Sequence, residues 1–262
     1  MNKKKVRWDA LLFYTLGSLY FLVPLLATFL FSLRGKKDEI GFQAYLNVFA
    51  DKNFVKSFGF SLEMAVLTVI LSLGLLVPTV LWVHLRAPRW KWVLDLFSLL
   101  PFVVPPVILA FGYIRLYGPA PLAWAGSPLL LVAGYVVLCF PFVYRSIDAG
   151  LRAIDLKRLW EAGASLGASP VRTLFSVVLP NLRSALLSAV FLTFATVLGE
   201  LTLAVLLAWP AFGPYMALVG RDLAYEPAAL AVISFALTWG ALGLIHLFSR
   251  GTHGVSRTQP TP

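Results

Sequence analysis

The chain has 262 residues, of which 59% are hydrophobic and only 13% are charged, and its mean hydropathy is +0.82. Soluble domains carry about 25% charged residues, so this composition excludes a disordered chain, a nucleic-acid-binding domain and an ordinary globular enzyme. One cysteine and three histidines exclude a disulfide framework and argue against a zinc site. The net charge of +10 suits an anionic membrane surface rather than DNA, because the basic residues are scattered between apolar runs. We therefore predict a polytopic membrane protein.

Apolar stretches long enough to cross a bilayer recur along the chain. A membrane-spanning helix needs about 20 mostly apolar residues, and helices are expected because the backbone must satisfy its own hydrogen bonds in lipid. The sequence predicts an all-α fold with six spans, at residues 10–33, 64–83, 96–114, 128–144, 184–208 and 227–249. The first apolar run is longer than the core of a typical signal peptide, so we interpret it as an uncleaved span. Three prolines in the third span, Pro101, Pro105 and Pro106, are expected to kink it, either to line a cavity or only to pack.

The distribution of lysine and arginine predicts the orientation of these spans. Fifteen of the 22 basic residues fall on one face: in the two tails, in the loop between the second and third spans, and in the segment between the fourth and fifth. The positive-inside rule then places both tails, residues 1–9 and 250–262, in the cytoplasm. The membrane domain covers residues 10–249, and its segment 145–183 also faces the cytoplasm.

The segment 145–183 is longer than the other loops and predicts two short helices. Asp155 is a candidate N-cap for a helix over residues 156–166, and Gly167 can end that helix in the left-handed conformation. Ser169 followed by Pro170 begins the second helix, and Pro180 interrupts the chain before the next span.

The first of these helices carries one acid, Glu161, followed by the small residues of 162–165. A bare surface beside a fixed charge suits insertion into a groove on another protein. The alternative is an amphipathic helix on lipid headgroups, with Leu156, Leu159 and Trp160 dipping into the bilayer.

The spacing of residues in this segment resembles the EAA loop of bacterial ABC importer permeases. That family pattern reads E-A-A, three residues, G, nine residues, I, one residue, L-P. Five of its seven positions are identical here, and Gly163 and Val177 stand where alanine and isoleucine are usual. The identical residues are Glu161, Ala162, Gly167, Leu179 and Pro180. The match lies between the fourth and fifth predicted spans, where the family has it, and this context strengthens the resemblance.

The resemblance implies a permease of the bacterial inner membrane with a type I fold, no catalytic site and no cofactor of its own. Its expected partners are a dimer of cytoplasmic ABC ATPase subunits, a second permease that is a copy or a paralogue, and a periplasmic or extracellular solute-binding protein. ATP is then bound by the ATPase, and the chain indeed has no G-x-x-x-x-G-K-[ST] loop.

The resemblance also implies roles for single residues of the loop. Glu161 is expected to make a charge contact or a helix cap at the ATPase, and Ala162 and Gly163 to allow close approach. Gly167 is expected to set the angle between the two short helices. Leu179 and Pro180 are expected to tie the second short helix to the fifth span.

Charged residues within or near the spans are further candidates. Glu200 falls inside the predicted fifth span, and a charge within a span is a functional candidate because it costs about 2.5–3.5 kcal/mol at the centre of the bilayer. The alternative is a wet position near the outer headgroups, and the stretch 198–200 resembles ferric-iron, sulfate and molybdate relatives of the family. Asp95 is expected to pair with Arg89 or Lys91.

The sequence leaves several alternatives for the solute, and two other classes of membrane protein are possible interpretations of the composition. The pattern looks like the polyamine, ferric-iron and thiamine branch of the family, and a polyamine-like cation is the expected solute. Ferric iron, thiamine, sulfate and molybdate are the alternatives. A secondary transporter would show two matching halves with broken helices, which are not visible. An intramembrane serine protease would need a G-x-S-x-G motif with a histidine partner, and the motif is missing.

Overall fold

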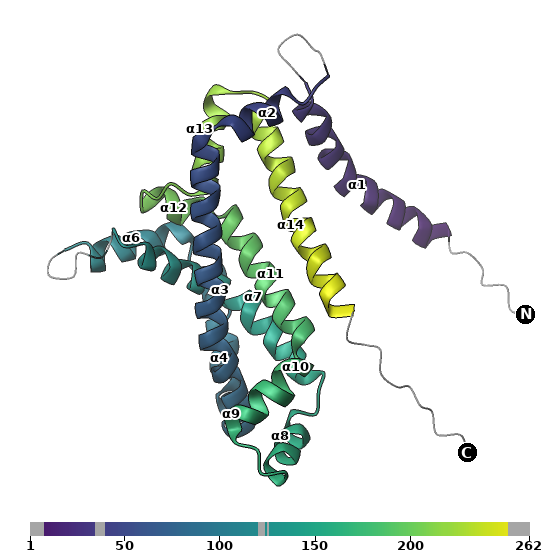
Figure 1. Ribbon diagram of the computed structural model, residues 1–262, viewed down its shortest axis with the longest axis vertical. Coiled ribbons are helices and arrows are strands. Elements are labelled where there is room, and N and C mark those ends of the chain that lie inside the picture. Colours follow the sequence, from purple (N-terminus) through teal and green to yellow (C-terminus); the bar gives the residue numbers. More distant parts are fainter. Residues whose placement is uncertain (1–7, 35–39, 120–123, 125, 251–262) are drawn as a thin grey trace, which may run out of the picture. The chain divides into compact units, whose positions relative to one another are not determined.

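The computed structural model describes residues 8–34, 40–119, 124 and 126–250, which form helices joined by short turns (Figure 1). The single β pairing within these ranges is an isolated bridge between Arg34 and Ile40, so the all-α prediction is confirmed for the described part of the chain. Several basic residues of the orientation argument lie outside the described residues, as do nearly all of both predicted tails. These residues are Lys3, Lys4, Lys5, Arg7, Lys36, Lys37 and Arg257.

Contacts divide the chain into two compact units. The first unit comprises Met1–Val55 with Tyr215–Ala236, and the second comprises Lys56–Pro214 with Leu237–Pro262. The helices of the first unit are α1 (Trp8–Ser32), α2 (Gln43–Ala50), most of α13 (Phe212–Asp222) and the beginning of α14 (Glu226–Arg250). Only 6% of the apolar window of α1 is buried, although its residues are apolar all round. A helix of this kind is stable only where lipid or another apolar partner covers it.

Polar contacts join the helices of the first unit. The hydroxyls of Ser32 and Tyr45 lie 2.7 Å apart, and the Asn47 amide donates to Glu226 Oε1 over 2.9 Å. The Tyr215 hydroxyl donates to Asp51 Oδ2 over 2.8 Å. Burial and this hydrogen bond to the carboxylate both raise the pKa of Tyr215, so its phenol remains a donor at neutral pH.

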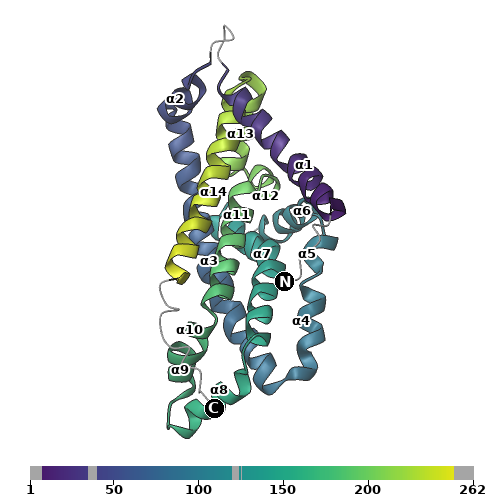
Figure 2. The same ribbon diagram turned by 90° about the vertical axis from the view of Figure 1, so that its right-hand side faces the viewer.

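The second unit is built around α3 (Lys52–Arg86), α7 (Pro128–Arg152) and α11 (Arg183–Gly199). α7 and α11 lie side by side in both views and make the most extensive contact between two helices (Figure 2). They approach closely at Gly150, where an added Cβ would lie 2.5 Å from the Cβ of Ala185 and 3.1 Å from Cδ2 of Leu182. Small residues allow helices to pack this closely in membranes, where the hydrophobic effect does not drive their association.

The predicted third span is broken rather than kinked. It consists of α4 (Lys91–Phe97), α5 (Leu100–Val103) and α6 (Pro106–Tyr117), and its two parts bend by 96° (Figure 2). Val104 and Pro105 both have extended backbone at the break. Each of these residues precedes a proline, which disfavours the helical conformation, so two consecutive prolines end one helix and begin the next.

The fifth span also differs from its prediction. α10 (Leu179–Asn181) meets α11 at a bend of 78°, and α11 ends at Gly199. A separate short helix, α12 (Thr202–Leu206), follows, so the predicted span 184–208 is not one continuous helix. The break is at Glu200, whose extended backbone ends α11.

Membrane spans can be counted by length and composition over the described residues. Three helices are long and apolar enough, within Leu12–Ser32, Lys52–Arg86 and Pro128–Arg152. If each of the two bent helix pairs described above is counted as one span, the number rises to five. Glu226–Gly240 is a further, shorter apolar helix. The fold is therefore that of a polytopic helical membrane protein.

Candidate functional site

Both ends of the first short helix in segment 145–183 have the predicted caps. α8 (Leu156–Ser165) begins after Asp155, whose carboxylate accepts from the backbone N–H of Arg158 over 3.2 Å. At its other end Gly167 has a φ of +75° and donates its N–H to the carbonyl of Ala164, while the N–H of Ala168 donates to the carbonyl of Gly163. These two bonds form a Schellman motif, which needs a residue such as glycine in the left-handed conformation.

The second helix begins as predicted and then changes its hydrogen-bond pattern. The Ser169 hydroxyl accepts from the N–H of Arg172 over 3.3 Å, and Pro170 occupies the first position of α9 (Pro170–Thr173). The helix continues as a π-helical turn over Leu174–Val178 and then as α10. Single π-helical turns are rare and occur frequently at functional sites.

The residues of the EAA-like pattern differ in their exposure to solvent. Glu161 is exposed, and Oε1 lies 3.9 Å from Nζ of Lys157, which is a weak surface contact. Ala162 and Gly167 are also exposed, whereas Leu179 and Pro180 are half-buried. The side chains open to a partner are thus those near the end of α8.

Gly163 is the exception, because it is buried inside the segment. A Cβ added there would lie 2.7 Å from Oγ1 and 2.8 Å from Cγ2 of Thr173. The glycine therefore allows close approach between α8 and α9. This contact explains why the residue is smaller than the alanine usual at this position.

The lipid-facing alternative for α8 does not fit its contacts. Leu156 is buried, and Trp160 packs against the hydrophobic core of the second unit. The exposed apolar side chains of the segment are instead Leu166, at 88%, Val171 and Phe175. They flank Gly167 on both sides along the chain. The sequence does not single them out, because a leucine at a helix end and two apolar residues at helical spacing are also typical of core positions.

Glu200 caps α12. Its carboxylate accepts from the backbone N–H groups of Thr202 at 2.7 Å and Leu203 at 3.0 Å, with Ala204 at 3.4 Å. Free N–H groups at a helix N-terminus favour a negative charge, so these bonds account for an acid in an apolar stretch. The carbonyl of Glu200 is approached closely as well, since a Cβ on Gly213 would lie 2.5 Å from its oxygen.

Substitutions at Glu200 separate this cap from a role in the solute pathway. Glu200→Ala is expected to lower the thermal stability of the purified protein by about 1 kcal/mol, the usual effect of losing a cap. Glu200→Gln keeps an acceptor oxygen and is expected to retain most of that stability. Thermal unfolding and solute uptake are measured on both variants. Loss of uptake by the glutamine variant at unchanged stability would instead assign the charge to the pathway.

A cluster of charged residues joins the end of α3, the beginning of α4 and the end of α7. Nζ of Lys91 lies 2.6 Å from Oδ1 of Asp148, and the Tyr144 hydroxyl donates to Asp95 Oδ1 over 2.8 Å. Within the described residues Asp95 forms no ion pair with Arg89 or Lys91, so that prediction is wrong: Asp95 accepts from Tyr144, and the lysine contacts Asp148 on α7. In the described part of the chain no three His, Cys, Asp or Glu side chains gather as they would around a metal ion.

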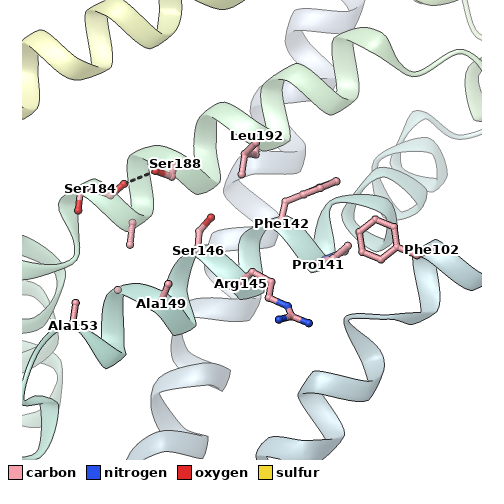
Figure 3. A pocket seen from close by; sticks show the side chains of 12 residues that line it. Phe102, Pro141, Phe142, Arg145, Ser146, Ala149, Ala153, Ser184, Ser188 and Leu192 are labelled. Carbon is pink, nitrogen blue, oxygen red and sulfur yellow. Dashed lines mark hydrogen bonds between the residues drawn. The ribbon is translucent and has the colours of Figure 1, made fainter. Parts of the chain in front are cut away.

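A groove of about 710 Å³ runs between α7 and α11 (Figure 3). Its polar lining consists of Arg145, Ser146, Ser184 and Ser188, and Figure 3 shows the bond from the Ser188 hydroxyl to the carbonyl of Ser184. The other lining residues are small or apolar: Phe102, Pro141, Phe142, Ala149, Gly150, Ala153, Ala185 and Leu192. The lining thus has one cation and no carboxylate.

Comparisons with known proteins agree on one family. Residues 66–250 match the family described as binding-protein-dependent transport system inner membrane component. A probable molybdenum ABC transporter permease protein of Haloferax volcanii is 30% identical over 198 residues, which are 71% of this chain and 72% of that protein. The molybdenum transport system permease protein ModB of Azotobacter vinelandii is 31% identical over 53% of this chain and 66% of its own length. A probable sulfate transport system permease protein of Prototheca wickerhamii is 29% identical over 71% of this chain and 75% of its length.

One solved structure supports the fold. The crystal structure of an amino acid ABC transporter with histidines superimposes with a TM-score of 0.55 at 20% identity. The match covers 76% of this chain and 93% of that one. It extends the similarity from sequence to the arrangement of the helices.

Proposed function

The chain belongs to the family of binding-protein-dependent transport system inner membrane components, and on that premise we propose that it forms half of the solute pathway of an ABC importer. Proteins of this family are transport permeases rather than enzymes. In this proposal the chain crosses the bacterial inner membrane six times. The contact of Lys91 with Asp148 supports one part of the orientation, because it requires the connections after α3 and after α7 to lie on the same side.

We propose that α8 and α9 couple this permease to a separate ATPase. The observation that carries this proposal is the exposed, capped turn at Gly167 with Leu166 beside it at 88% exposure. Full burial of a leucine side chain contributes roughly 1.5–3 kcal/mol, so Leu166 has more to gain from a partner's groove than any polar neighbour. Ala162 offers close approach beside it, and Glu161 has no strong partner within the described residues and is available for a charge contact.

The complete importer then needs further chains. ATP hydrolysis requires a pair of ATPase subunits, because this chain carries no phosphate-binding loop. A second permease, either a copy or a paralogue, completes the pathway, and a solute-binding protein delivers the solute. The two tails face the cytoplasm in this arrangement, on the same side as α8.

We propose a small oxyanion, molybdate or sulfate, as the solute. Two relatives are described as molybdenum permeases and one as a sulfate permease. The groove between α7 and α11 supports an anion as well, since Arg145 and three serine hydroxyls line it without any carboxylate. A polyamine cation would favour carboxylates, so the predicted polyamine specificity has no support from this lining.

Uptake by proteoliposomes tests the proposal. The permease, reconstituted with its ATPase and binding protein, is expected to accumulate labelled molybdate or sulfate only when ATP is inside and the binding protein outside. Putrescine, ferric iron and 2-aminoethylphosphonate serve as competitors and as alternative labelled solutes. Uptake of one of these instead would correct the solute, and uptake of none with ATP and binding protein present would contradict the importer.

A further inference from the structure

Asp148 is a buried carboxylate that contacts three basic side chains from different parts of the second unit. Its side chain is 7% exposed and lies on α7, one turn before that helix ends. Nζ of Lys91, the first residue of α4, is 2.6 Å from Oδ1, and a terminal nitrogen of Arg152 is 2.6 Å from Oδ2. Nε2 of His84, in the last turn of α3, is 3.1 Å from Oδ1 but without the alignment of a hydrogen bond.

A second contact joins the same helices one turn away. Tyr144 precedes Asp148 by four residues and therefore faces the same side of α7. Its hydroxyl donates to Asp95 of α4 over 2.8 Å. Two polar links, at Lys91 and Asp95, thus hold α4 against α7, while His84 brings the end of α3 to the same carboxylate.

The cluster is placed directly before the segment that precedes α8. α7 ends at Arg152, and only residues 153–155 separate it from α8. Figures 1 and 2 place the beginning of α4 at the same end of this unit as α8 and α9. A displacement of α8 therefore reaches Asp148 before it reaches the rest of α7.

We propose that Asp148 is a positioning residue for transport: it links the end of α7 to α3 and α4, so that movement of α8 shifts three helices together. This inference rests on the proposed coupling of α8 to an ATPase. Separating a buried charge from its partner leaves it uncompensated, which is strongly unfavourable, so these contacts resist a movement of α7 without α4. Without it, α7 moves alone and the pathway does not change over its whole width.

Matched carboxylate-to-amide substitutions test the proposal in the reconstituted importer. Asp148→Asn is expected to retain assembly with the ATPase and its ATP hydrolysis, while molybdate taken up per ATP hydrolysed falls about tenfold. Asp155→Asn is the control, because Asp155 lies in the same segment, is 55% exposed and is replaced by an equally good cap. Asp155→Asn is expected to keep the wild-type ratio.

Lys91 supplies a second pair of variants in case Asp148→Asn does not accumulate. Lys91→Arg preserves the charge and is expected to keep uptake per ATP, whereas Lys91→Met is expected to lower uptake per ATP in the importers that still assemble and hydrolyse ATP. Uptake that stays proportional to ATP hydrolysis in Lys91→Met, or an equal loss in Asp155→Asn, would overturn the proposal. A wild-type chain that never assembles with an ATPase would overturn the proposed function first, so the two failures are distinguishable.

Discussion

Gly150→Val, a substitution within α7, is expected to lower the free energy of unfolding strongly. Even a Cβ at this position meets the Cβ of Ala185 at 2.5 Å, and valine adds two methyl groups at this close contact between α7 and α11. Overpacking of this kind costs about 1–3 kcal/mol in protein cores. The melting temperature of the purified protein and its yield in membranes are both expected to fall.

A complementary exchange identifies the cause of that loss. Gly150→Ala alone is expected to be destabilising, and adding Ala185→Gly is expected to restore most of the stability, because it removes the atom that the new Cβ meets. Gly74→Val is the control, since Gly74 lies within α3 and nothing lies within 4 Å of its added Cβ. Equal stability of Gly150→Val and Gly74→Val would contradict the close packing of α7 and α11.

Gly167→Val is expected to separate the permease from its ATPase while the spans remain folded. Gly167 has a φ of +75°, a conformation that costs other residues roughly 1–2 kcal/mol and β-branched residues more. The Schellman bonds to the carbonyls of Gly163 and Ala164 are then lost, and the side chain of Leu166 changes its position at the end of α8. We expect copurification of the ATPase to fall about tenfold at an unchanged amount of permease in the membrane.

Two further variants sharpen this measurement. Gly167→Asn is expected to retain much of the binding, because asparagine tolerates the left-handed conformation. Glu161→Ala changes only an exposed side chain, so any loss of binding reports on the docking contact and not on folding. Normal ATPase binding and uptake by both Gly167→Val and Glu161→Ala would refute the assignment of this segment.

Features set by neighbouring residues could be predicted from the sequence. The caps at Asp155 and Ser169 and the left-handed Gly167 depend on a few adjacent residues, and the structure has all three. The apolar runs likewise predicted helices, because the backbone has no other way to satisfy its hydrogen bonds in lipid. The EAA-like spacing identified the family correctly.

Features set by distant residues could not be predicted. Asp148 has an unremarkable setting between Ile147 and Ala149, and its burial arises only because α3 and α4 meet α7. The sequence predicts a fifth span that Glu200 interrupts, because the stretches of α11 and α12 are both apolar, and only the backbone shows that the helix itself breaks there. The consecutive prolines at 105 and 106 predicted a distortion, but the 96° angle depends on where α6 packs.

The contact between Gly163 and Thr173 has a consequence for the strength of the proposed docking. α8 and α9 are already packed on each other, and both begin at satisfied caps, before any partner arrives. A preorganised ligand loses little conformational entropy on binding, so nearly all of its contact energy is available as affinity. In the proposed coupling, such a segment is expected to move as one rigid unit, since a displacement of its tip is not absorbed by rearrangement within it.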